Sequence, residues 1–133
     1  MNTHTDLSSK KKIRIAIAGL GFGESVHIPA ARFNNNIELI GLWHPREDKL
    51  QATCEMHDLI AYSNWEELIN DPIIEGIIIA TPPNPRFELS IQALEAGKHL
   101  LLEKPTCKNS IQVKDLQKKA EEQKYYELPF LLG

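Results

Sequence analysis

Short apolar runs alternate with amphipathic segments along most of this chain. Runs rich in β-branched residues, such as Ile13–Ala18, are typical of strands that are buried on both faces of a parallel sheet. Segments with apolar residues three and four positions apart, such as 46–57, are typical of helices. The pattern predicts strands at residues 13–18, 37–43, 60–62, 76–80, 99–102 and 130–132, and helices at residues 25–33, 46–57, 63–69, 86–96 and 109–124.

Strands and helices that alternate in this way predict an α/β fold with a doubly wound parallel sheet, covered by helices on both faces. We expect a single domain over residues 12–133, preceded by a flexible polar tail at residues 1–11. Sheets of this kind bind ligands beyond the carboxyl ends of their strands. Those ends fall in four short segments of this chain, at residues 19–24, 44–46, 81–86 and 103–105.

Local signals predict several helix boundaries. Ser63 and Glu66 have the spacing of a capping box at the start of the helix 63–69. Gly97 is expected to stop the helix 86–96. Pro29 lies inside the expected helix 25–33, where it should bend or shorten that helix.

Composition and charge narrow the classes of function. The chain has 133 residues, of which 42% are hydrophobic and 25% charged, as is usual in globular domains. Its formal net charge of −3 argues against a nucleic-acid-binding surface, and no apolar run is long enough to span a membrane. Cys54 and Cys107 do not have the spacing of metal ligands, so we expect no metal site and a reducing, cytoplasmic location.

The first strand runs into a glycine-rich turn that opens a helix. Gly19, Gly21 and Gly23 follow the strand, with Phe22 between the last two. Glycine is needed where the backbone turns sharply and approaches a pyrophosphate, so these four residues are predicted to bind a dinucleotide. Glu24 stands where the dinucleotide-binding pattern has its third glycine. The alternative interpretation is a tight strand-to-helix turn that binds no ligand.

The end of the second strand carries the residues expected at the adenosine ribose of that dinucleotide. His44 lies 21 residues after Gly23, where enzymes that use NAD usually have an acidic residue. Arg46 follows two residues later, and its guanidinium is suited to a 2′-phosphate. We therefore predict that His44 and Arg46 bind NADP, with NAD as the alternative cofactor. The competing interpretation of Arg46 is a solvated residue in the first turn of the next helix. The missing acid also argues against an S-adenosylmethionine-dependent methyltransferase.

Further motifs carry a resemblance to a known family. Residues 96–99 read AGKH, residues 103–105 read EKP, and residues 80–83 read ATPP. Together with the glycine-rich turn, these motifs make the chain from residue 13 onward similar to the Gfo/Idh/MocA family, which is named after glucose–fructose oxidoreductase and inositol dehydrogenase.

The resemblance implies an N-terminal Rossmann domain that binds NAD(P). It implies that Lys104 lies beside the nicotinamide and contacts the substrate hydroxyl that is oxidised, and that Glu103 helps to order this loop. Thr81, Pro82 and Pro83 are expected close to the nicotinamide ribose. The substrates that the resemblance implies are sugars, inositols and related polyols.

The chemistry of a lysine agrees with that role. Removal of a hydride from a carbinol carbon also requires the hydroxyl proton to leave, and a partly desolvated lysine can accept or relay that proton. Glu103 would oppose the lowering of the Lys104 pKa if the two side chains met, but adjacent strand residues point to opposite faces. Considered without the resemblance, a solvated loop is the competing interpretation of this motif.

The chain departs from the family in two ways. Arg86 stands where the family often carries histidine, and we expect it either to bind an anionic group or to cap the helix surface. Members of the family also continue into a second α/β domain that carries substrate-binding residues and oligomer contacts. We expect this chain to lack that second domain.

We therefore expect the nucleotide-binding domain of an NAD(P)-dependent oxidoreductase that acts on sugar or polyol hydroxyls, incomplete for catalysis as this chain. The alternatives are a non-catalytic NAD(P)-binding or interaction module and a truncated gene product. An association between copies of the chain is a further expectation to test.

Overall fold

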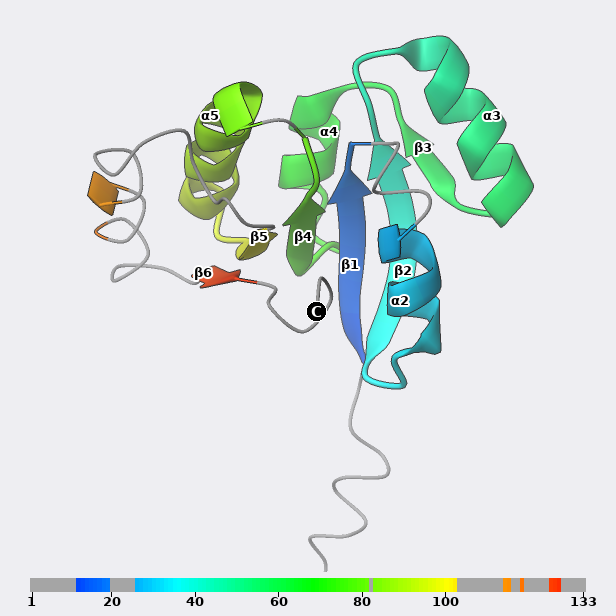
Figure 1. Cartoon of the computed structure of the whole chain (residues 1–133), viewed down its shortest axis with the longest axis horizontal. Coiled ribbons are helices and arrows are strands. Elements are labelled where there is room, and N and C mark those ends of the chain that lie inside the picture. The colour runs from blue at the N-terminus through cyan, green and yellow to red at the C-terminus, as the bar shows by residue number, and fades with distance from the viewer. Residues whose placement is uncertain are drawn as a thin grey trace, which may run out of the picture.

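In the part of the chain that the structure describes, six parallel strands form one sheet in the order β3-β2-β1-β4-β5-β6. The computed structural model describes residues 12–19, 26–81, 83–102, 114–115, 118 and 125–127. The strands are β1 (Ile13–Ala18), β2 (Ile37–Trp43), β3 (Ile60–Tyr62), β4 (Gly76–Ile79), β5 (His99–Leu102) and β6 (Tyr125–Glu127). The helices are α2 (Ile28–Phe33), α3 (Glu47–His57), α4 (Trp65–Asn70) and α5 (Pro83–Glu95), and they flank the sheet (Figure 1). The predicted α/β fold with a doubly wound parallel sheet is confirmed.

The strand order creates a crevice beside β1. This strand pairs with β2 on one side and with β4 on the other, so the direction of winding reverses between β1 and β4. In doubly wound sheets, ligands bind at such a reversal, outside the carboxyl ends of the strands. We call this side the carboxyl edge, and it is formed by the ends of the strands at Ala18, Trp43, Tyr62, Ile79 and Leu102.

The core forms two layers, one on each face of the sheet. Along β1, Ile15 and Ile17 belong to one layer and Ala16 and Ala18 to the other, as the two-residue period of a strand requires. The isoleucine layer packs against α2 and α3, whereas the alanine layer packs against α4 and α5. Burial of one large aliphatic side chain contributes about 1.5–3 kcal/mol. Those that are fully buried include Ile28, Leu50, Leu68, Ile77 and Leu94.

Prolines shift the starts of two helices from the predicted residues. α2 begins at Ile28 and has Pro29 in its first turn, so the helix is shorter than the predicted 25–33. α5 begins at Pro83 rather than at residue 86, which brings Pro83 and Pro85 into its first turn. In the first turn of a helix the backbone N–H that proline lacks has no partner within the helix, so proline is tolerated there.

The cap of α4 is Asn64, so the prediction of Ser63 as the capping residue is wrong. The Asn64 side chain accepts a hydrogen bond of 2.8 Å from the backbone N–H of Glu66, which satisfies one of the open N–H groups at the helix start. The Ser63 hydroxyl instead donates to the Glu47 carboxylate at 3.0 Å. Both residues have side chains suited to capping, and the tertiary contact with Glu47 engages one of them.

The last strand lies at residues where the sequence pattern predicts no strand. β6 pairs in parallel with β5, with Leu100 opposite Tyr125 and Leu102 opposite Glu127. Residues 114, 115 and 118 are helical, within the predicted helix 109–124. The predicted strand at 130–132 lies outside the described residues, as does the predicted flexible tail at 1–11.

A buried lysine joins two loops at the amino edge of the sheet, which is the side opposite the carboxyl edge. Gly97 follows α5 with a φ of +84° and stops the helix, as predicted. Lys98 comes next, with 7% of its surface exposed. Its ammonium donates hydrogen bonds to the carbonyl oxygens of Asp71 (2.8 Å) and Ile74 (2.6 Å), in the loop before β4. Burial lowers the pKa of this ammonium.

Candidate functional site

Gly19 lies where three strand ends meet at the carboxyl edge. Its φ is +112°, and its N–H donates to the Trp43 carbonyl at 2.8 Å. A Cβ atom on this residue would lie 3.0 Å from the backbone C and O atoms of Ala80 and 3.2 Å from the backbone N of Thr81. Glycine is therefore required at residue 19 both by the backbone conformation and by the close approach of β4.

The rest of the glycine-rich turn, with Gly21, Phe22, Gly23 and Glu24, lies outside the described residues. Its predicted contact with a pyrophosphate stays a prediction. The described part of the turn fixes where the chain leaves β1, because the Ala80 N–H also donates to the Ala18 carbonyl at 2.8 Å. The turn therefore starts directly beside the end of β4.

A cavity of about 120 Å³ opens at this junction. It brings together three of the predicted site residues, Gly19, His44 and Thr81. The cavity is smaller than a typical ligand pocket of about 300–1,000 Å³, so it can hold one part of a dinucleotide rather than the whole molecule. The other lining residues come from the ends of β2 and β4 and the start of α5, and they are Trp43, Pro45, Ala80, Pro85 and Leu89.

Thr81 is the polar residue of this cavity that follows β4. It has 7% of its surface exposed, and its hydroxyl has no hydrogen-bond partner among the described residues. A buried hydroxyl without a partner costs about 1–3 kcal/mol. Such a group is expected where a ligand completes the hydrogen bonding.

Arg86 holds the backbone of Thr81 from the first turns of α5. Its Nε and Nη2 atoms both donate to the Thr81 carbonyl oxygen, at 3.0 and 2.5 Å. The side chain is buried, with 5% of the residue exposed, so the expectation that Arg86 caps the helix surface is wrong. A buried guanidinium contributes positive charge at the carboxyl edge. Pro83 begins α5 next to it, and Pro82 lies outside the described residues.

The turn between β2 and α3 places His44 and Arg46 at the carboxyl edge. The Nδ1 atom of His44 accepts a hydrogen bond of 2.9 Å from the backbone N–H of Arg46, so the proton of the neutral ring is on Nε2. Burial lowers the pKa of His44, which favours that neutral form. The Arg46 side chain is exposed, and its Nη2 atom lies 2.9 Å from Oδ2 of Asp48.

The predicted catalytic loop follows β5. This strand pairs in parallel with β4, with Leu102 opposite Ile79, so the chain leaves β5 on the same edge as Thr81. Glu103 and Lys104 come directly after Leu102 in the sequence, and both lie outside the described residues, as does Cys107. Their predicted roles therefore stay predictions.

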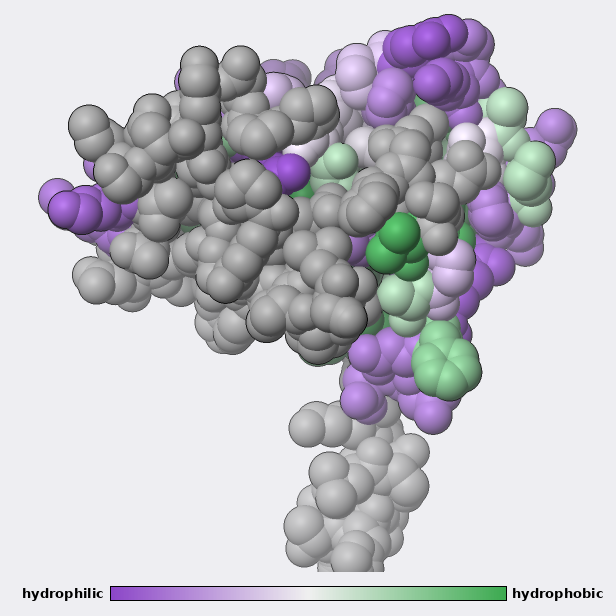
Figure 2. Space-filling view, viewed as in Figure 1, coloured by the Kyte–Doolittle hydropathy of each residue, from purple (hydrophilic) through white to green (hydrophobic). Residues whose placement is uncertain are grey.

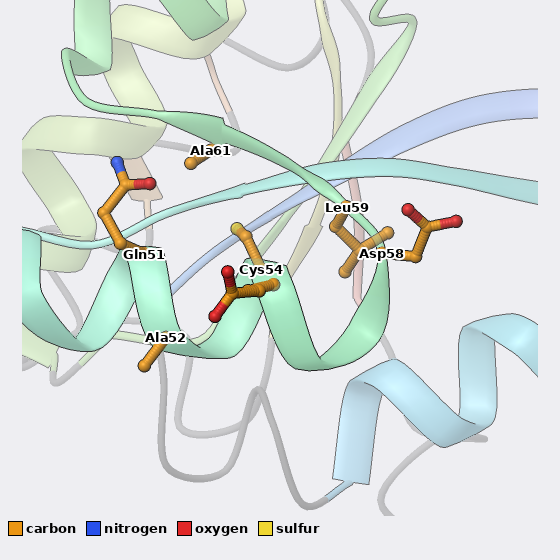
Figure 3. Close-up of a pocket in the computed structure, with 7 residues that line it drawn as sticks. Gln51, Ala52, Cys54, Asp58, Leu59 and Ala61 are labelled. Carbon is orange, nitrogen blue, oxygen red and sulfur yellow. The ribbon is translucent and has the colours of Figure 1, made fainter.

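A second hollow of about 440 Å³ lies between α3 and β3. Figure 3 shows Gln51 and Cys54 on α3, facing Ala61 on β3. Burial raises the pKa of the Cys54 thiol to about 11, so this thiol is protonated and unreactive near neutral pH. The hollow is lined by none of the predicted site residues.

The described ranges contain neither a metal site nor a membrane-spanning helix. No group of three or more His, Cys, Asp or Glu side chains there has the arrangement of a metal site. None of the described helices has the length and apolar character needed to cross a membrane.

A sequence model of oxidoreductases with an NAD-binding Rossmann fold, named Gfo/Idh/MocA, matches residues 13–126. The chain belongs to the Gfo/Idh/MocA oxidoreductase family. The resemblance expected from the AGKH and EKP motifs is confirmed, and the described strands are those of the NAD-binding part of this family.

The chain is also similar to individual known proteins. An uncharacterized oxidoreductase of Synechocystis sp. is 38% identical over 100 residues, which cover 74% of this chain and 27% of that protein. Galactose 1-dehydrogenase of Pseudomonas fluorescens is 35% identical over 101 residues, which cover 71% of this chain and 30% of the dehydrogenase. The crystal structure of biliverdin reductase from Synechocystis sp. PCC 6803, in complex with biliverdin and NADP+, matches with a TM-score of 0.79 and 27% identity over 86% of this chain and 37% of the reductase. The chain therefore spans between 27% and 37% of the length of these relatives.

The structure adds residues to this Gfo/Idh/MocA site that the sequence pattern does not reveal. Trp43 and Leu89 have the apolar character of core residues, yet both line the cavity. Trp43 also packs on Trp65, with ring centroids 5.2 Å apart. Asp48 contacts Arg46. The one sequence feature that could have identified these residues is their position, because each lies within a few residues of a strand end or of the start of α5.

Proposed function

We propose that this domain binds NAD(P) across the carboxyl edge of its sheet and forms the cofactor-binding part of an oxidoreductase. The observation that carries the proposal is the junction at Gly19, where a positive φ and backbone packing against Ala80 adjoin a cavity lined by the Thr81 hydroxyl. The buried hydroxyl fits a ligand that brings its own hydrogen-bonding groups to this cavity, and the positive φ at Gly19 is typical of the turn that starts a dinucleotide-binding loop.

We assign different parts of the cofactor to the two turns that follow β1 and β4. Gly19, Gly21, Phe22 and Gly23 would hold the pyrophosphate through backbone N–H groups, as glycine-rich turns of this type do. Thr81, Pro82 and Pro83 would lie along the nicotinamide ribose, with Arg86 holding the Thr81 carbonyl in place. Burial of Arg86 supports this arrangement, because a fixed cation near bound phosphates stabilises their negative charge.

We propose NADP as the preferred cofactor. His44 and Arg46 follow β2 where an acidic residue would bind the ribose hydroxyls of NAD. The Arg46 guanidinium is exposed and able to donate several hydrogen bonds to a 2′-phosphate. The NADP+ bound in the cyanobacterial biliverdin reductase supports the same choice.

For the chemical step we propose Lys104 as the catalytic residue. When bound, the cofactor supplies or accepts the hydride. Lys104 would accept the hydroxyl proton of the substrate, or return it in the reverse direction, if partial desolvation lowers its pKa toward neutrality. Glu103 would order the loop that carries it.

The substrate class rests on the relatives. Galactose 1-dehydrogenase supports a sugar or polyol hydroxyl, whereas biliverdin reductase is an example with a different kind of substrate. Both relatives are much longer than the matched region. We therefore propose that the 133-residue chain binds cofactor but needs substrate-binding residues beyond this domain for turnover, because hydride transfer requires both reactants to be positioned. The cytoplasmic location expected from the cysteine content stays a prediction.

The test is a titration of the 133-residue chain with NADPH and with NADH, followed by tryptophan fluorescence. Trp43 lines the cavity and provides the signal. Saturable binding of NADPH, tighter than that of NADH, is the expected result. A folded chain that binds neither cofactor would overturn the proposal, and equal or tighter binding of NADH would overturn the choice of NADP.

Gly19→Ala should weaken the binding of both cofactors by about tenfold or more, equivalent to about 1.4 kcal/mol. The added Cβ would lie 3.0 Å from the Ala80 backbone. Gly97→Ala is the matched control, because Gly97 also has a positive φ but nothing lies within 4 Å of an added Cβ. Both variants carry backbone strain, and only the first is at the site. Equal losses of affinity in the two variants would show that Gly19 acts through stability alone.

A further inference from the structure

The turn between β2 and α3 contains an ion pair that the proposed function does not use. Arg46 and Asp48 are two residues apart, and the guanidinium donates to the carboxylate at 2.9 Å. The Arg46 backbone is fixed by its hydrogen bond to His44 and by its position as the residue that caps α3. The pair is exposed, with 60% of the Arg46 and 71% of the Asp48 side chain accessible. Polar side chains cover this part of the surface, over α3 (Figure 2).

The ion pair places a negative charge where the 2′-phosphate of NADP is proposed to bind. The hydrogen bond from Arg46 lowers the pKa of the Asp48 carboxyl, so Asp48 is ionised at neutral pH. A carboxylate and a phosphate compete for the same guanidinium donors, and they repel each other when both are close to it. NAD lacks the 2′-phosphate, so its binding does not involve this competition.

We propose that Asp48 is a specificity-determining residue that, as the counter-ion of Arg46, weakens the binding of the 2′-phosphate and narrows the preference for NADP over NAD. The inference rests on the proposed function, in which Arg46 binds that phosphate. Asp48 would act on affinity for one cofactor only.

The neighbouring Glu47 provides a matched control. It lies in the same first turn of α3 and carries the same charge. Its carboxylate accepts hydrogen bonds from Gln51 at 2.5 Å and from Ser63 at 3.0 Å, on a different set of partners from Asp48. Removal of the Glu47 charge therefore tests the general effect of net charge near α3, without releasing Arg46.

The experiment measures dissociation constants of NADPH and NADH for the wild-type chain, Asp48→Asn and Glu47→Gln at one ionic strength. Asp48→Asn should tighten NADPH binding by about 3- to 10-fold, because exposed ion pairs and their removal have modest effects in water. NADH binding should change by less than about twofold, as should NADPH binding to Glu47→Gln. In an Arg46→Ala background, Asp48→Asn should also change NADPH binding by less than about twofold.

Each other outcome contradicts the inference. Weaker NADPH binding to Asp48→Asn would show that Asp48 orients Arg46 for the phosphate. Weaker NADH binding would show that Asp48 contacts the ribose itself. If Asp48→Asn and Glu47→Gln changed the NADPH dissociation constant equally, the change would come from the net charge near α3 and not from the release of Arg46. If Asp48→Asn binds both NADPH and NADH with the wild-type affinities, this inference alone is overturned. If the folded wild-type chain binds neither cofactor, the proposed function and this inference are overturned together.

Discussion

Two buried cations, at opposite edges of the sheet, use the same kind of bond. Lys98 at the amino edge and Arg86 at the carboxyl edge are 7% and 5% exposed, and each donates two hydrogen bonds to backbone carbonyl oxygens. Lys98 divides its bonds between Asp71 and Ile74, whereas the Nε and Nη2 atoms of Arg86 both donate to Thr81.

The surroundings of the two cations differ. Lys98 joins a loop to a helix end, and the site residues lie at the other edge. Arg86 holds the residue whose buried hydroxyl has no partner among the described residues, next to the cavity at Gly19. If the proposed cofactor site is right, the buried cation at the amino edge contributes to stability alone, whereas the one at the carboxyl edge also contributes to ligand binding.

The largest expected effect is at the amino edge. Lys98→Met should remove two hydrogen bonds from a charged donor, each worth about 1.5–3 kcal/mol. The Asp71 carbonyl oxygen would keep its bond from the Ile74 N–H at 3.1 Å, whereas the Ile74 carbonyl oxygen would lose the lysine donor. We expect a loss of about 2–5 kcal/mol in the free energy of unfolding, measured by urea denaturation, with the NADPH dissociation constant of the folded protein unchanged. A change in that constant would mean that the two edges are coupled.

Arg86→Met should have a smaller effect on stability and a clear effect on binding. Loss of the donors to the Thr81 carbonyl should cost about 1–3 kcal/mol of stability. Because Thr81 would no longer be held, NADPH and NADH should each bind about 5- to 10-fold more weakly, a change of about 1–1.4 kcal/mol. The comparison variant is Arg86→Lys, which keeps the charge and should recover part of the affinity. Unchanged binding of both cofactors to Arg86→Met would make Arg86 a second structural cation like Lys98.

Thr81→Val should have the smallest effect on stability, and with the opposite sign. The substitution replaces a buried hydroxyl without a described partner by a methyl group of similar size, so the free energy of unfolding should rise by up to about 1 kcal/mol. Cofactor affinity should fall by about 3- to 10-fold, since one hydrogen bond is lost. Thermal unfolding and fluorescence titration of the same sample check both changes. A fall in stability would show that the hydroxyl has a structural partner.

The sequence predicts the strands of this domain better than its local boundaries. The run at residues 13–18 is rich in β-branched residues and ends in Gly19, and the structure has β1 at those residues. Ser63 and Asn64 are both good capping residues, and only the tertiary contact of Ser63 with Glu47 decides between them. β6 is three residues long and has no apolar run to mark it, because its pairing with β5 decides that it is a strand.

In the candidate site, too, features set by neighbouring residues in the sequence could be predicted, whereas features set by packing between distant elements could not. Gly19 was predicted because its role follows from the strand that precedes it. The burial of Arg86 was not predicted, because it depends on how α5 packs beside the end of β4. The contribution of Trp43 and Leu89 to the cavity depends on bringing β2 and α5 together, and no local pattern carries that information.

The direction of β6 determines where the polypeptide continues. Because β6 runs parallel to β5 and ends at Glu127 opposite Leu102, the backbone emerges from the last strand on the carboxyl edge. This is the edge that also carries Gly19 and Thr81, with β5 between β6 and β4. If the proposed substrate-binding residues follow β6 in the chain, they would be attached on the same edge as the proposed cofactor site and would need no linker that crosses the sheet. Covalent attachment of this kind raises the effective concentration of one binding group near another.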